Sequence, residues 1–164
     1  AEGGEFFYLP NENILLAGQC RNNLRGAEQM AEKLNVSNLH IINSRVYHLD
    51  TSISPIFNNE YDCIGLICAR EVFSNNEIND LRSICASNQW ELIEIEHQDI
   101  NSSLSFRTAM NGLTLPGLFI GSKKLNQKPI SDFALSNNIT FDSTNVSQFN
   151  LSGGSVHCLT NELF

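Results

Sequence analysis

The chain has 164 residues, 41% of them hydrophobic, which is enough apolar material for the core of one domain. Its formal net charge of −8 argues against a nucleic-acid-binding protein, because phosphate backbones attract clustered Lys and Arg. It has neither a signal-peptide pattern nor an apolar run of about 18 residues, so no membrane span is expected.

The first predicted unit covers the region from residue 6 to residue 42. Two short apolar runs, at 6–9 and 14–17, are separated by Pro-Asn-Glu-Asn, which predicts a β-hairpin. Residues 25–34 then carry apolar side chains at helical spacing, and 39–42 form an apolar run typical of a strand.

The second predicted unit repeats this order of elements. The expected elements are a strand at 51–57, a strand at 63–68, a helix at about 76–86 and a strand at 90–96. Ser74 and Glu77 have the spacing of a capping box, which places the start of the helix just after Ser74.

The third predicted unit is shorter and more polar. The expected elements are strands at 113–115 and 118–120, a helix near 128–136 and a strand at 140–141. After a Gly-Gly turn, residues 156–163 alternate in polarity and predict a closing extended segment. Three ββαβ units in succession predict an α+β fold with internal repeats.

The five cysteines are an odd number and lack CxxC or any other metal-binding spacing. We therefore expect reduced thiols in a cytoplasmic protein, with no metal site and no cofactor.

Three short segments carry residue types suited to nucleophilic catalysis. Residues 2–5 read Glu-Gly-Gly-Glu, residues 47–51 read Tyr-His-Leu-Asp-Thr, and residues 153–158 read Gly-Gly-Ser-Val-His-Cys. Together they offer a thiol nucleophile, a histidine base and carboxylates. If residues 48–50 are extended, His48 and Asp50 share one face and point into one cavity.

Two further segments occur in an order that matches a known superfamily. Residues 18–23 read Gly-Gln-Cys-Arg-Asn-Asn, similar to a Gly-x-x-Arg-Thr-Asn motif with Asn22 in place of threonine, and Asn111 precedes a predicted strand. In this order the five segments resemble the guanidine-modifying enzymes with the pentein fold: arginine deiminases, dimethylarginine dimethylaminohydrolases and amidinotransferases. The resemblance covers nearly the whole chain and implies a propeller of five ββαβ blades.

The resemblance assigns catalytic roles to three residues. Cys158 is the implied nucleophile, and His48 is the general acid and base that protonates the leaving amine and activates water. Glu2 is expected to hold the imidazolium or to bind a guanidinium nitrogen. Acidic surroundings disfavour a thiolate until a guanidinium binds, so we expect substrate-assisted deprotonation.

Four residues are implied to bind the substrate. They are Asp50, Glu5, which stands where aspartate is usual, Arg21 as a partner of the α-carboxylate, and Asn111. His157 is given no role, because in an extended segment it points away from the face of Cys158.

The implied activity is hydrolysis of the guanidino group of arginine or a methylated arginine, giving citrulline and an amine through a thiouronium on cysteine. An amidinotransferase, a hydrolase of a ureido substrate such as citrulline, and a non-catalytic pentein scaffold are the alternatives. Residues 1–164 are interpreted as the C-terminal catalytic part of a single pentein domain, about three of five blades. Because Ala1 leads directly into the Glu-Gly-Gly motif, we expect a complementary N-terminal polypeptide or subunit that completes the propeller and supplies a guanidinium-binding aspartate.

Overall fold

A computed structural model describes residues 2–96 and 109–160, which form three successive units of the same topology. Each unit is a three-stranded sheet with one helix. The first strand pairs antiparallel with the second, and the helix then connects the second strand to a parallel third strand. The prediction of an α+β fold built from ββαβ repeats is confirmed, whereas the closed propeller and its blade number stay predictions.

The first unit contains β1 (Phe6–Leu9), β2 (Ile14–Gly18), α1 (Leu24–Lys33) and β3 (Asn38–Ile42). Asn13 has a φ of 51° in the hairpin turn, a conformation that asparagine tolerates better than most residues.

The second unit contains β4 (Ile53–Phe57), β5 (Cys63–Ala69), α2 (Asn75–Asn88) and β6 (Glu91–Ile95). The predicted capping box is present, since the Ser74 and Glu77 side chains each accept a hydrogen bond from the other residue's backbone N–H.

The third unit contains β7 (Leu113–Leu115), β8 (Leu118–Gly121), α4 (Lys128–Asn137) and β9 (Thr140–Ser143). A short helix, α5 (Ser147–Asn150), then leads to the Gly-Gly turn. Within the described residues, no helix is both long and apolar enough to cross a membrane.

Two predicted extended segments are wrong in part. The second unit starts with a 3-10 turn at Leu49–Thr51, because the Thr51 and Ser52 amides donate to the carbonyls of His48 and Leu49. The closing segment also forms a 3-10 turn, at His157–Leu159, where backbone amides again donate hydrogen bonds to the carbonyl three residues earlier. The end of the predicted segment, 161–163, lies outside the described residues.

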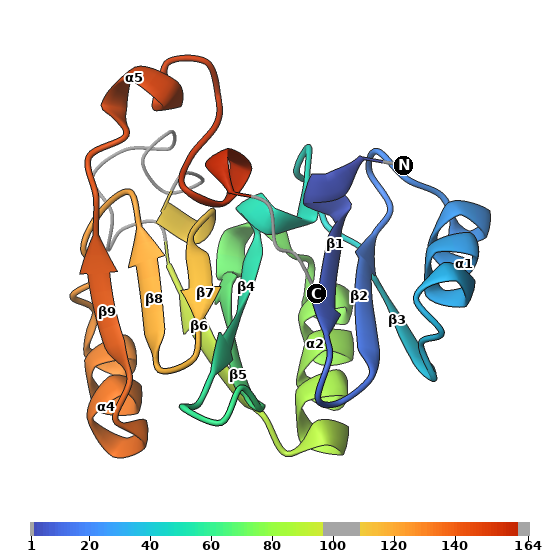
Figure 1. Cartoon of the computed structure of the whole chain (residues 1–164), viewed down its shortest axis with the longest axis horizontal. Coiled ribbons are helices and arrows are strands. Elements are labelled where there is room, and N and C mark those ends of the chain that lie inside the picture. The colour runs from blue at the N-terminus through green and yellow to red at the C-terminus, as the bar shows by residue number, and fades with distance from the viewer. Residues whose placement is uncertain (1, 97–108, 161–164) are drawn as a thin grey trace.

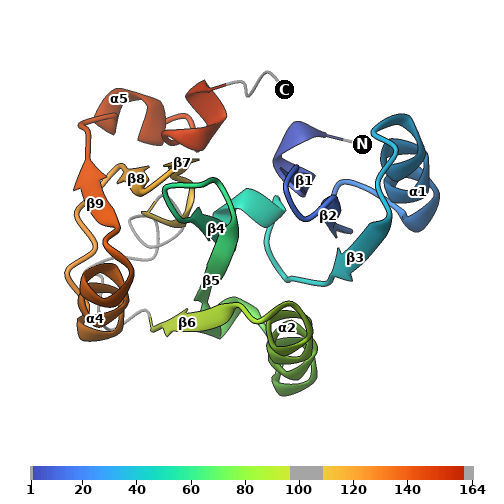
Figure 2. The same ribbon diagram turned by 60° about the horizontal axis from the view of Figure 1, so that its bottom comes forward.

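Two apolar cores join neighbouring units. One lies between the first and second units and the other between the second and third. Helix α2 contacts β6 of its own unit and β3 of the unit before, so it fills the space between two sheets. Figure 2 shows the first strands β1, β4 and β7 toward the middle of the molecule, with the helices α1, α2 and α4 outside.

Three of the five cysteines belong to the core between the first two units. Cys63, Cys68 and Cys85 are buried, and burial raises the pKa of each thiol, that of Cys85 to about 12. They are therefore packing residues, whereas Cys20 and Cys158 are exposed.

Candidate active site

Four of the predicted site residues lie in equivalent places of the three units, in the turn before the first strand. Glu2 precedes β1, His48 and Asp50 precede β4, and Asn111 precedes β7. These turns lie at the same end of the molecule, at the top of Figure 1, where the turn that carries Cys158 also lies. Repetition of one topology thus brings residues far apart in sequence to a single site.

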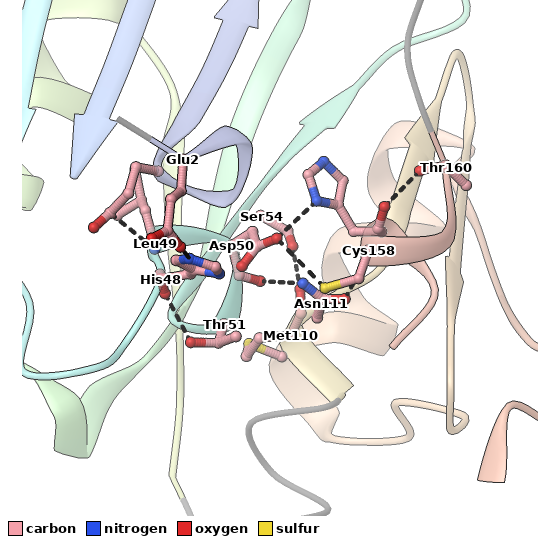
Figure 3. Close-up of polar contacts among 12 residues, drawn as sticks. Glu2, His48, Leu49, Asp50, Thr51, Ser54, Met110, Asn111, Cys158 and Thr160 are labelled. Carbon is pink, nitrogen blue, oxygen red and sulfur yellow. Dashed lines mark hydrogen bonds and ion pairs between the residues drawn. The ribbon is translucent and has the colours of Figure 1, made fainter. Parts of the chain in front are cut away.

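Asp50 is at the centre of this site. It is only 2% exposed, and its Oδ2 lies 2.9 Å from Nδ1 of His157 and 3.9 Å from Sγ of Cys158 (Figure 3). Its Oδ1 is also buried, and no partner for that oxygen is found among the described residues. A buried acceptor without a donor is costly, so this oxygen is suited to a ligand that donates a hydrogen bond.

The turn that carries Cys158 is held by Asn111. The Cys158 amide donates to Asn111 Oδ1 at 3.2 Å, and the His157 amide donates to the Asn111 carbonyl at 3.1 Å. Nδ2 of Asn111 donates to the Asp50 carbonyl at 3.4 Å. Both ends of the buried Asn111 amide are thus engaged within the protein, and its predicted contact with substrate stays a prediction.

His48 forms a short hydrogen bond with Glu2. The His48 Nε2 and Glu2 Oε2 atoms are 2.6 Å apart, and the hydrogen bond from His48 is the main cause that holds the pKa of Glu2 below its ordinary value. Glu2 is therefore an ionised acceptor that fixes a proton on Nε2 of His48.

Gly4 allows His48 and Asp50 to approach the first turn closely. A Cβ on Gly4 would lie 2.8 Å from Nδ1 of His48 and 3.0 Å from Oδ2 of Asp50. A side chain in place of the second glycine of the Glu-Gly-Gly motif would therefore collide with the His48 ring and the Asp50 carboxylate.

Arg21 lies on the other side of Glu2. Its Nε is 3.2 Å from Glu2 Oε1, and its guanidinium lies 4.6 Å from the centre of the Tyr47 ring. The Tyr47 phenol and the Glu2 carboxylate raise the pKa of Arg21. Arg21 borders a separate polar hollow of about 630 Å³.

Glu5 is buried and bonds to backbone amides. One carboxylate oxygen accepts from the Arg21 amide, and the other accepts from the Leu49 amide at 3.2 Å. Gly18 leaves the space for this carboxylate, since a Cβ there would lie 1.9 Å from Glu5 Oε2. Glu5 thereby connects three loops around the site, and its predicted contact with substrate stays a prediction.

The exposed Cys158 thiol lies between two hollows. One, of about 670 Å³, is also bordered by His48, Asp50 and His157, and the other, of about 530 Å³, by His48, Tyr47 and Asn111. Within the described part of the chain, no three His, Cys, Asp or Glu side chains are grouped as metal ligands.

His157 is the residue that sequence reasoning missed. The expectation that it points away from the face of Cys158 is wrong, because the 3-10 turn brings the side chains of both residues to Oδ2 of Asp50. The available signal was its position beside the predicted nucleophile.

No protein-family model and no curated protein matches this chain. Among solved structures, the N-terminal domain of ArgZ bound to product, an arginine dihydrolase from the ornithine–ammonia cycle in cyanobacteria, has a TM-score of 0.72 at 20% identity, covering 96% of this chain and 54% of that one. AgrE in complex with ornithine and NAD+ has a TM-score of 0.73 at 21% identity, covering 95% of this chain and 21% of that one. SxtG, an amidinotransferase of Microseira wollei in saxitoxin biosynthesis, has a TM-score of 0.67 at 19% identity, covering 94% and 45%.

The chain thus spans about half the length of the ArgZ domain and of SxtG, and nearly all of it takes part in each match. At these identities the likeness concerns the fold. Over the matched region the chain shares the fold of these pentein-type arginine dihydrolase and amidinotransferase structures, as the order of its motifs predicted.

Proposed function

We propose that the chain carries the catalytic part of an enzyme that hydrolyses the guanidino group of arginine or a methylated arginine, with Cys158 as nucleophile. The observation that carries the proposal is the buried Asp50 carboxylate, which has an oxygen without a partner among the described residues and lies beside the exposed thiol. Guanidinium is a cation with several N–H donors and fits this acceptor. The likeness to ArgZ and SxtG supports the same substrate class.

In the first half of the reaction, the thiol proton passes to His48 and the thiolate attacks the guanidinium carbon. A C–S bond forms and gives a neutral tetrahedral adduct. The C–N bond to the departing amine then breaks as His48 returns a proton to its nitrogen, which leaves a positively charged thiouronium on Cys158. The carboxylates of Asp50 and Glu2 stabilise the positive charge.

In the second half, water attacks the thiouronium carbon while His48 accepts a proton from it. The C–S bond then breaks as the hydroxyl proton of the adduct passes to the sulfur, the ureido product leaves, and His48 releases its proton to solvent. An amidinotransferase would use the same thiouronium with an acceptor amine in place of water. The likeness to SxtG, which is an amidinotransferase, supports transfer as the alternative reaction.

Product analysis tests the proposal directly. The protein in its complete assembly is incubated with arginine, methylated arginines, agmatine or citrulline, with and without an added acceptor amine, and the products are identified by mass spectrometry. A ureido product with release of ammonia or methylamine supports hydrolysis, and a new guanidino compound supports transfer. No turnover and no binding of any guanidino compound would refute both.

Arg21→Ala should separate substrate recognition from chemistry. If Arg21 binds the α-carboxylate, KM for arginine should rise about tenfold to a hundredfold, as expected for loss of a hydrogen bond between charged groups. Agmatine, which has no carboxylate, should be much less affected. Equal losses with both substrates would show that Arg21 acts through its ion pair with Glu2 instead.

We also propose that further pentein blades cover the hollow beside Cys158. Apolar side chains of Phe6, Tyr8, Met30 and Leu34 line it, and the matched ArgZ domain is about twice as long as the matched region. Solubility and turnover should therefore increase when the chain is co-expressed with the missing blades. Full activity of residues 1–164 as a lone monomer would contradict this.

A further inference from the structure

We propose that His157 is a positioning residue, which holds the Asp50 carboxylate so that its free oxygen faces the substrate. This inference rests on the proposed function, because it concerns how the same site binds guanidinium. The His157 ring is well placed for this role, because its side chain is only 16% exposed and its ring packs 5.2 Å from the Phe7 ring, centre to centre.

The two oxygens of Asp50 lie in different environments. Oδ2 lies within 2.9 Å of Nδ1 of His157 and also near the Cys158 thiol, whereas Oδ1 is buried and has no partner among the described residues. With a proton on Nδ1, His157 donates to Oδ2 and fixes the rotation of the carboxylate. Oδ1 is then the acceptor left for a guanidinium N–H.

The backbone around this pair restrains both residues. Asn111 accepts the His157 amide on its carbonyl and donates from its side chain to the Asp50 carbonyl. The two turns therefore keep their separation, and the side-chain bond from His157 decides the orientation of the carboxylate. Loss of the bond should weaken guanidinium binding more than it slows the bond-breaking steps, because the nucleophile and His48 stay in place.

Three substitutions of His157 distinguish its donor atom from its bulk. The side-chain amide of His157→Asn lies near the position of Nδ1 and can still donate to Asp50. The side-chain amide of His157→Gln lies near the position of Nε2 and cannot donate to Asp50. His157→Phe keeps only the packing on Phe7. His40→Gln, a half-buried histidine of β3 away from the site, is the matched control.

The experiment measures kcat, KM and equilibrium binding of arginine in the complete assembly, with circular dichroism and thermal unfolding as checks of folding. We expect His157→Asn and His40→Gln to bind within about threefold of the unsubstituted protein. His157→Gln and His157→Phe should bind about tenfold to a hundredfold more weakly, with a smaller change in kcat.

Three results would overturn the inference while leaving the proposed function intact. The first is unchanged binding in His157→Phe, and the second is an equal loss in His157→Asn and His157→Phe when both are folded. The third is a loss confined to kcat with a changed pH profile, which would assign His157 to proton transfer instead. Failure of the unsubstituted protein to bind any guanidino compound would refute the proposed function itself.

Discussion

Cys158→Ser should abolish turnover, by more than about a thousandfold, while binding of arginine is retained. A serine hydroxyl is a much weaker nucleophile than a thiolate, and the neighbouring Asp50 carboxylate opposes formation of an alkoxide. The Asn111 bond to the backbone amide of residue 158 does not depend on the side chain, so the turn should persist. Steady-state kinetics and calorimetric binding measure the two effects separately.

Mass spectrometry of the quenched reaction should find the thiouronium adduct on the peptide that contains Cys158. Cys85→Ala is a suitable control, because it removes a buried thiol of α2 that is not part of the candidate site. It should change stability without removing activity. An active Cys158→Ser protein, with the adduct on Cys63 or Cys85, would refute the assignment of the nucleophile.

His48→Gln should lower kcat by about a hundredfold to ten-thousandfold, the usual contribution of a general acid and base. The glutamine amide can take the place of Nε2 and keep the hydrogen bond to Glu2, which is 2.6 Å long in the histidine protein. The substitution therefore preserves the local structure but cannot transfer protons. KM should change little, since Asp50 still accepts the guanidinium.

His40→Gln again serves as the matched control, because it makes the same substitution outside the candidate site. An unchanged kcat in His48→Gln would show that another group, or water, transfers the protons.

Much of the fold follows from local sequence patterns. The hairpin turn after Leu9, the capping box at Ser74 and the alternating apolar runs each depend on residues close together in the chain, and each appears as expected. The ββαβ order of all three units could therefore be predicted. The turn at His157–Leu159 could not be predicted, because the alternation in 156–163 satisfies the period of a strand. Hydrogen bonds of the 3-10 type and the distant Asn111 carbonyl determine this turn instead.

The sequence predicts which residues belong to the candidate site better than it predicts the contacts between them. The motifs identify Glu2, His48, Asp50 and Cys158, which the structure brings to one end of the molecule. Their pairing depends on how the units dock: Glu2 contacts His48, and Asp50 contacts His157. Spacing within a motif carries no information on such contacts between units.

Each unit carries at least one site residue in the turn before its first strand. This placement determines how the protein would lose the proposed activity. Each sheet keeps its own hydrogen bonds, but the distances from His48 to Glu2 and from Asp50 to Cys158 span two packing interfaces between units. A small slip at either interface would misalign the reacting groups without unfolding a strand or a helix. The proposed activity is therefore expected to be more sensitive than the secondary structure to the alignment of the units, and inactivation should precede loss of secondary structure.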